Sequence, residues 1–334
     1  MRFCFIVEAN YRLESMPTVI ARQLVQWGHA VDILEPSNTV TSLCDLKEQV
    51  YDAYVLKTVS DGPGLCILEA AEAAGIPTIN NSRAIRLVRD KSLCAAFAYA
   101  QGLPFPRSYF VANSELLKKI PQEDYPLVVK PTNGSSGRGI HLVNSPAQLA
   151  ELKVDGPSVC FFLAQCYVEN PGYDIKLYVI GNDVYAVSRE SPLHPDLEVT
   201  NRLLPLKPEW LSLARRVGEI FGLDIYGLDV LESSTGPVVV DINDFPSFER
   251  VPRAVSRVAG YVLHLAKEAK LKRQEQPRAM GAVNRERPQK LAKADRRKRT
   301  GVSSEVPQVT REGPIRPGVA ETQTSGELPV GKLR

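Results

Sequence analysis

Residues 227–248 of the chain read GLDVLESSTGPVVVDINDFPSF, and this stretch decides the fold. Its two apolar runs, residues 228–231 and 238–242, flank a Ser-Ser-Thr-Gly-Pro sequence, which is typical of the turn of a β-hairpin. Each run also carries an acidic residue among apolar neighbours, Asp229 in the first and Asp241 in the second. We therefore predict a hairpin with acidic side chains on one of its faces.

The acidic face of this hairpin is a candidate cation site. Strand alternation places Asp241 and Asn243 on one face of the second strand, and the hairpin can bring Asp229 opposite them. Three oxygen-bearing side chains on an apolar hairpin need a cation to offset their desolvation. Because all three ligands are hard oxygens, Mg²⁺ or Mn²⁺ held together with substrate phosphates fits best. The alternative is that Asp241 starts a turn that Asn243 caps, while Asp229 forms a salt bridge.

Length and charge predict a multidomain protein with a distinct C-terminal segment. The 334 residues suffice for two or three domains, and 44% of them are hydrophobic. Residues 267–334 hold 17 Lys or Arg and 8 Asp or Glu, whereas the rest of the chain holds 24 basic and 30 acidic residues. Because periodic apolar residues end near Leu271, we predict that residues 272–334 form a disordered basic tail. Its run KADRRKR at residues 293–299 suggests weak polyanion binding, although a solvated charged run is the simpler interpretation.

Cysteine usage and hydropathy indicate a cytoplasmic protein. The six cysteines are scattered without a CxxC pair, which favours buried, reduced thiols. No stretch approaches the roughly 20 apolar residues that span a bilayer, and the chain opens on a strand-like run rather than a signal peptide. We therefore expect neither a membrane segment nor export.

The first 88 residues predict an open parallel α/β domain. Strand-like apolar runs and helical patterns alternate at short spacing, which is typical of parallel strands joined by helices. No Gly-x-Gly-x-x-Gly sequence follows any of these runs, so we predict no dinucleotide site in this part of the chain. The expected strands are residues 2–8, 30–34, 51–57 and 76–79, and the expected helices are residues 17–27 and 64–74.

Residues 89–271 predict a second region of two α+β lobes, divided near residues 165–170. We place the boundary before this region between residues 80 and 106, and draw it after residue 88. Residues 192–206 carry no regular pattern. The expected strands are residues 108–111, 127–130, 140–143, 159–168, 175–180 and 184–189, and the expected helices are residues 90–101, 114–119, 147–152, 210–221 and 252–267.

A lysine and a glycine-rich loop form a candidate phosphate site. Lys130 ends an apolar strand directly before the loop TNGSSGRG. A lysine on a rigid strand suits a phosphate, and the backbone N–H groups of Ser135, Ser136 and Gly137 can approach phosphate oxygens closely. The lysine precedes the loop, so this is not the P-loop motif. The alternative is a flexible hairpin connection.

Further candidates lie at helix and strand ends. Lys91 begins a helix after Asp90 and either adds a second phosphate contact or pairs on the surface. Gln165, Cys166 and Tyr167 end a buried strand, where backbone groups can bind an adenine.

Two more groups of residues surround that strand break. Asp174 can accept a hydrogen bond from a ribose hydroxyl or orient Lys176. Arg189, Asn201 and Arg202 flank the irregular stretch, where they can meet an anionic substrate or a transferred phosphoryl group. We count Asn201 among the nucleotide-binding candidates.

Together, these features resemble the ATP-grasp superfamily and, within it, the RimK-type carboxylate–amine (glutamate) ligases. The matching stretches are RDKSLCAAFAYAQGLPFPRSYFV, LVVKPTNGSSGRGIHLV, LAQCYVENPGYDIKLYVIG and the acidic hairpin, from about residue 77 to residue 266. The resemblance implies the fold class α/β and α+β: a preATP-grasp-like open α/β domain, then a two-lobed ATP-grasp fold, then the disordered basic tail.

The resemblance also implies a role for each matching residue. Lys91 and Lys130 would contact the ATP phosphates, Cys166 and Tyr167 would form the adenine hinge, and Asp174 would lie at the ribose. Two Mg²⁺ (or Mn²⁺) ions would be held by the hairpin residues Asp229, Asp241 and Asn243. Lys176 would offset the triphosphate charge, and either Arg138 or Arg202 would cover the acyl phosphate.

The chain departs from the family pattern at three places. Lys176 stands where such ligases usually have an arginine, which keeps the charge but loses the bidentate fork. Asp241 replaces a usual glutamate. The family's Asn-x-x-Pro-Gly ending reads Asn-Asp-Phe-Pro-Ser at residues 243–247, and this sequence also resembles inositol phosphate kinases of the same superfamily.

The expected reaction is ATP-dependent amide or peptide bond formation. A substrate carboxylate attacks the γ-phosphate of ATP, and an amine, such as an amino acid, then displaces phosphate from the acyl phosphate. ADP and phosphate are the by-products. The alternatives are phosphoryl transfer to a polyol phosphate and a non-catalytic nucleotide-binding scaffold whose tail recruits a polyanion.

Overall fold

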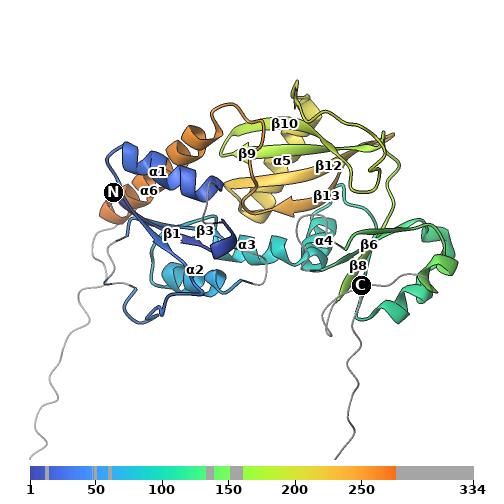
Figure 1. Cartoon of the computed structure of the whole chain (residues 1–334), viewed down its shortest axis with the longest axis horizontal. Coiled ribbons are helices and arrows are strands. Elements are labelled where there is room, and N and C mark those ends of the chain that lie inside the picture. The colour runs from blue at the N-terminus through green and yellow to red at the C-terminus, as the bar shows by residue number, and fades with distance from the viewer. Residues whose placement is uncertain are drawn as a thin grey trace, which may run out of the picture. The chain divides into compact units, whose positions relative to one another are not determined.

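The computed structural model describes residues 1–275 apart from 12–14, 47, 49–50, 59–61, 133–138 and 151–160. These residues belong to one compact unit that ends at Ala279 (Figure 1). Most of the predicted tail therefore lies outside the described residues. Within the described ranges, no helix is both long and apolar enough to cross a membrane.

A four-stranded parallel sheet forms the N-terminal part, as predicted. The order is β2-β1-β3-β4, because β1 pairs in parallel with β2 on one side and with β3 on the other. The strands are β1 (Arg2–Val7), β2 (Ala30–Leu34), β3 (Ala53–Lys57) and β4 (Thr78–Ile79), and the helices are η1 (Ala9–Tyr11), α1 (Met16–Gln26) and α2 (Gly64–Ala73).

Two short helices follow the sheet where the sequence predicted one. Helix α3 (Ser82–Arg89) was missed, and α4 (Lys91–Ala100) begins where expected. Asp90 breaks the chain between them with extended backbone angles, and its carboxylate accepts the N–H groups of Ser92 and Leu93. The break aims Arg89 and Lys91 at two separate carboxylates, as described below.

The middle lobe is a four-stranded antiparallel sheet, ordered β5-β8-β6-β7. The predicted helices at residues 114–119 and 147–152 are instead 3₁₀ turns in their described parts, because such short segments gain little from α-helical hydrogen bonds. The strands are β5 (Ser108–Val111), β6 (Leu127–Pro131), β7 (His141–Val143) and β8 (Phe162–Cys166), and the 3₁₀ turns are η2 (Ser114–Lys119), η3 (Gln122–Asp124) and η4 (Pro146–Ala150).

The C-terminal lobe is a five-stranded antiparallel sheet, ordered β11-β10-β9-β12-β13. Helix α5 (Pro208–Phe221) covers one face, and it starts with a proline and ends at Gly222 in the left-handed region. The short strand β11 lies inside the stretch that was predicted to be irregular. The strands are β9 (Tyr173–Ile180), β10 (Asp183–Glu190), β11 (Leu203–Leu204), β12 (Ile225–Ser233) and β13 (Gly236–Asn243).

The N-terminal sheet shares a hydrophobic core with the C-terminal sheet. Side chains of β1, β3 and α1 pack in one cluster with side chains of β9, such as Tyr178, and with Phe245 and Phe248 after β13. Helix α6 (Ala254–Glu275) adds Val258 and Val262 to this cluster and lies beside α1 (Figure 1). It continues past residue 267, where the sequence predicted its end. The predicted boundary after residue 88 thus falls inside a continuously packed unit.

The start of α2 depends on a glycine. A Cβ at Gly64 would lie 2.5 Å from Thr58 Cγ2 and 2.8 Å from Ile6 Cγ2. We predict that Gly64→Ala lowers the free energy of unfolding by about 1–3 kcal/mol, because the helix must move off the sheet. Gly260→Ala is the control, since nothing lies within 4 Å of its added Cβ, and it should raise that free energy by roughly 0.5–1 kcal/mol. Urea unfolding measures both, and equal effects would contradict the prediction.

Candidate active site

Strand pairing places a lysine and two aspartates in one row across the C-terminal sheet. Lys176 of β9 lies opposite Asp229 of β12, which lies opposite Asp241 of β13. A bulge at Val240 interrupts the pairing of β12 and β13, so Val239 packs in the core while Asp241 and Asn243 share the other face. The register thus agrees with the arrangement expected from alternation.

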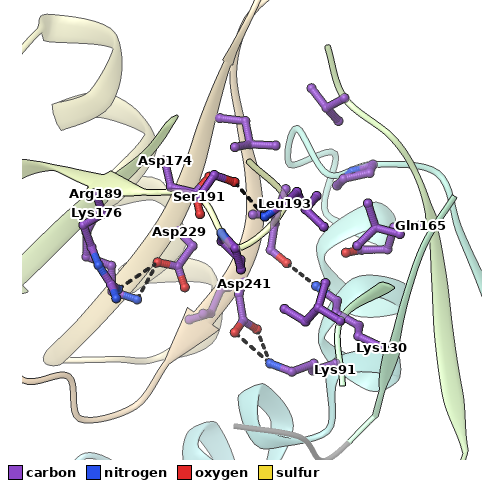
Figure 2. A pocket seen from close by; sticks show the side chains of 18 of the residues that line it. Lys91, Lys130, Gln165, Asp174, Lys176, Arg189, Ser191, Leu193, Asp229 and Asp241 are labelled. Carbon is purple, nitrogen blue, oxygen red and sulfur yellow. Dashed lines mark hydrogen bonds and ion pairs between the residues drawn. The ribbon is translucent and has the colours of Figure 1, made fainter. Parts of the chain in front are cut away.

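Each aspartate of this row is bonded to a lysine. Lys176 Nζ donates to Asp229 Oδ1 at 2.7 Å, and Lys91 Nζ donates to both carboxylate oxygens of Asp241 at 2.7 Å (Figure 2). Asn243 Nδ2 donates to the other oxygen of Asp229 at 3.2 Å. Lys176 crosses between the strands beside Gly227, where a Cβ would lie 3.0 Å from its Cε. A glycine at this position therefore makes room for the lysine.

Burial and charge act in opposite directions on this cluster. Burial by itself raises the pKa of Asp241, but the charges of Lys91 and Lys130 outweigh it, and the pKa is lowered. Burial likewise acts to lower the pKa of Lys91, but Asp241 reverses the effect. Both groups are therefore held in their charged forms.

Lys130 is also strongly desolvated. Its ammonium group donates to the carbonyl of Val240, at the bulge, at 3.0 Å, and the residue is 6% exposed. Burial lowers its pKa to about 8, although Asp241 opposes this shift. An anion that enters the cavity would stabilise the charged form of this lysine.

A third acidic residue, Asp174, lies on β9 two residues before Lys176. Burial, followed by the negative charge of Asp229, raises the pKa of Asp174 to about 6. Asp174 is paired in register with Arg189 of β10. The Arg189 guanidinium is about half exposed and lies 4.0 Å from Asp229 Oδ1. The Arg189 guanidinium therefore lies next to the carboxylate row and is also accessible to solvent.

The segment between the two antiparallel sheets, residues 167–172, forms one wall of the site. Tyr167 Oη lies 2.9 Å from His194 Nε2, and Leu197 packs over Gly172. These contacts hold the stretch that follows β10 against the connecting segment. The predicted split near residues 165–170 falls at this connection.

The charged groups described above line one cavity of about 530 Å³, which lies between the middle and C-terminal sheets. Figure 2 shows Lys91, Lys130 and Gln165 on one side of it, facing Asp229 and Asp241. The predicted residues that line it are Lys91, Lys130, Gln165, Cys166, Tyr167, Asp174, Lys176, Arg189, Asn201, Asp229, Asp241 and Asn243.

Other predicted residues are not brought to the cavity or lie outside the described ranges. Arg202 is exposed and does not line it; its backbone pairs with Ser188 of β10 instead. Ser135, Ser136, Gly137 and Arg138 fall in the range 133–138, outside the described residues.

Sequence reasoning also missed several lining residues. Arg89, Leu193, Val240 and Asp244 line the cavity, but none was predicted as a site residue. Arg89, directly before Asp90, and Asp244, directly after Asn243, carry charges that could have identified them.

The donor set fits a magnesium-like cation. Among the described residues, His, Cys, Asp and Glu side chains nowhere gather in threes, so a third protein ligand would have to be the Asn243 amide oxygen. Asp229 and Asp241 already bind ammonium groups, which shows that their oxygens face a position where positive charge is stabilised. Carboxylate and amide oxygens are the ligands that Mg²⁺ and Mn²⁺ prefer.

The phenylalanine that departs from the family ending is a core residue. Phe245 is 2% exposed, and its ring lies 6.1 Å from that of Phe248, whose ring packs at a tilt against Tyr178 with the centroids 5.6 Å apart. The aromatic residue therefore anchors the end of β13 to the shared core. Its place in the core accounts for it without a kinase-type substrate contact.

Comparison with known proteins assigns the family. The model of the RimK-like ATP-grasp domain matches residues 88–260. The chain belongs to the RimK-like ATP-grasp family. Its activity is ATP-dependent ligation of a carboxylate to an amine, with release of ADP.

Two curated relatives of this RimK-like chain carry the same name. A probable alpha-L-glutamate ligase from Haemophilus ducreyi is 30% identical over 60% of this chain and 69% of its own length. A probable alpha-L-glutamate ligase from Marinomonas is 26% identical over 79% of this chain and 95% of its own.

Solved structures support the RimK-like fold. A RimK domain ATP-grasp protein from Sphaerobacter thermophilus aligns with a TM-score of 0.63 at 20% identity, over 78% of this chain and 98% of its own. The D-alanine–D-alanine ligase of Bacillus anthracis aligns with a TM-score of 0.58 at 17% identity, over 83% of this chain and all of its own.

The lowered pKa of Lys130 gives a test of its place in this RimK-like site. At about pH 8.5 the buried lysine is largely neutral, and a triphosphate beside it would raise its pKa, so ATP binding should take up a proton. We predict that Lys130→Met abolishes this uptake, whereas Lys118→Met, at an exposed ion pair with Glu115, leaves it intact. Titration calorimetry in two buffers of different ionisation enthalpy measures it. Equal uptake by both variants would contradict the prediction.

Proposed function

We propose that this ligase joins the amino group of an α-amino acid, L-glutamate foremost, to a small-molecule or peptide carboxylate. The observation that carries the proposal is the row of Lys176, Asp229 and Asp241 at a cavity that Lys91 and Lys130 also line. Glutamate is favoured because both relatives described above are named as alpha-L-glutamate ligases.

The cavity divides into a nucleotide end and a phosphate end. We assign the adenine to Gln165, Cys166 and Tyr167, where β8 ends and backbone groups become available for hydrogen bonds. Asp174 would bind the ribose, and Asn201 would contact the nucleotide from the stretch after β10.

The phosphate end collects positive charge. Lys91 and Lys130 would bind the triphosphate, and Lys176 would keep Asp229 in place as its counter-ion. Asp229, Asp241 and Asn243 would hold two Mg²⁺ or Mn²⁺ ions, which would offset the charge of the phosphates when bound. Fixed cations of this kind stabilise the charge that develops during transfer to the carboxylate.

The reaction depends on how the protein positions the reactants, and it requires no covalent bond between the protein and the substrates. The acid's carboxylate oxygen attacks the γ-phosphorus and ADP leaves; the amine nitrogen then attacks the acyl phosphate and phosphate leaves. Holding both reactants in line in a cavity shielded from water accounts for much of the acceleration. The exposed guanidinium of Arg189 is suitably placed to bind an anionic substrate group.

The deciding experiment measures ADP release from Mg-ATP with a panel of amino acids, short peptides and inositol phosphates. We expect release that requires an amine and yields an amide. Asp241→Asn should lower it by at least ~100-fold, because the row loses a charge that positions cations. Asp183→Asn, at an exposed ion pair with Arg257, is the matched control and should not change it. Phosphate transfer to a polyol without any amine would overturn the proposal.

We further propose that catalysis does not depend on the basic tail and takes place in the cytoplasm. A chain ending at Ala279 should keep ADP release within about twofold of the full chain, because every lining residue precedes that point. Retention on heparin should fall in parallel, because the chain loses a surplus of basic residues. Loss of turnover on truncation would contradict the proposal that catalysis does not depend on the tail.

A further inference from the structure

Three polar side chains from the N-terminal part of the chain converge on the two residues that follow Asn243. These residues, Asp244 and Phe245, come directly after the end of β13. The strand is the outer one of its sheet, so it pairs only with β12. Its free side cannot be fixed by a neighbouring strand, and other contacts must hold it in place.

Arg89 makes the first of these contacts. Its Nε donates to Asp244 Oδ1 at 3.1 Å and its Nη2 to Asp244 Oδ2 at 2.9 Å, which forms a two-bond fork. Its Nη1 and Nη2 also donate to the hydroxyl and the carbonyl of Thr58, at the end of β3. Both side chains of the ion pair are largely buried, 7% and 14% exposed. Paired, hydrogen-bonded charges in such a position hold their geometry firmly.

Asn80 makes the second contact, through the backbone. Its Nδ2 donates to the carbonyls of Asp244 and Ile225, at 2.6 and 2.7 Å. Its Oδ1 accepts the N–H groups of Asp224 and Ile225, at 2.9 and 2.8 Å. The residue is 1% exposed, so one buried amide ties the end of β13 to the beginning of β12.

Lys57 makes the third contact. Its ammonium group donates to the carbonyl of Phe245, and the rings of Tyr11 and Phe245 lie 5.0 and 5.8 Å from it. Burial lowers the pKa of Lys57, although Asp244 opposes the shift. Lys57 is the last residue of β3, and Thr58, which Arg89 contacts, follows it directly.

We propose that Arg89, Asn80 and Lys57 are positioning residues that hold Asp241 and Asn243 in the geometry that binds the cations. The inference rests on the proposed function, because it assumes that these two side chains bind the ions. It makes the N-terminal α/β domain part of the cation site, without any residue of that domain touching an ion. Groups that orient metal ligands from behind typically change metal affinity 10–100-fold when removed.

The chain contains a matched control for the Arg89 fork. Arg86, on the same helix, makes an equivalent fork to Glu69 of α2 at 2.8 Å for both bonds, but on the surface and without a contact to Asp244. Arg89→Lys and Arg86→Lys each keep the charge and lose a two-bond fork to a carboxylate, one fork buried behind β13 and the other on the surface. Asp244→Asn weakens the same contact from the other side with almost no change of shape.

The experiment measures Mn²⁺ binding to the full chain by electron paramagnetic resonance, with and without a non-hydrolysable ATP analogue. We expect Arg89→Lys and Asp244→Asn to weaken Mn²⁺ binding by about tenfold, and to raise the Mg²⁺ concentration that half-saturates ADP release by a similar factor. Arg86→Lys should bind Mn²⁺ like the wild type. Thermal unfolding shows whether each variant remains folded.

The outcomes separate the inference from the function on which it rests. The inference would be overturned if folded Arg89→Lys and Asp244→Asn bound Mn²⁺ as tightly as the wild type. A lowered melting temperature in such variants would then show that the contact contributes to stability alone. No Mn²⁺ binding by the wild type in either condition, or binding that survives Asp241→Asn, would overturn the assigned cation site and the inference with it.

Discussion

The site depends on two partly buried aspartates that are each paired with a lysine. Desolvation alone would raise the pKa of Asp241, and nearby positive charge outweighs it. Lys91 provides that charge for Asp241, and Lys176 provides it for Asp229. Because each lysine comes from a different element, α4 and β9, the two ion pairs also fix where those elements sit against the hairpin.

Strand geometry then decides what these charged groups face. The row across β9, β12 and β13 turns its charged side chains toward the cavity, and residues between them, such as Leu177 and Leu228, pack under α5. Because of the bulge at Val240, Val239 points into the core and Asp241, two positions later, points into the cavity. The carbonyl of Val240 is left to accept a hydrogen bond from Lys130. One irregular residue thus connects the middle lobe to the acidic hairpin.

The N-terminal domain packs directly against the lobe that carries the site. It shares a core with the C-terminal sheet, and its strand ends contact the segment after β13. Such a continuous core couples displacements of the N-terminal sheet to the position of the hairpin, because packed interiors transmit strain. The aromatic residue at position 245 belongs to this coupling, which explains why the chain differs from the family ending there.

The sequence alone was sufficient for what depends on local order: the acidic hairpin, the strand lysine before the glycine-rich loop, the helix that starts after Asp90, and the resemblance to RimK-type ligases. These follow from alternation, capping and spacing along the chain. Only the tertiary structure decided that Lys176 pairs with Asp229, that Arg202 lies away from the cavity, and that Arg89 reaches Asp244. Residues 89 and 244 are far apart in the chain, and their contact depends on the packing of two sheets, which no local pattern encodes.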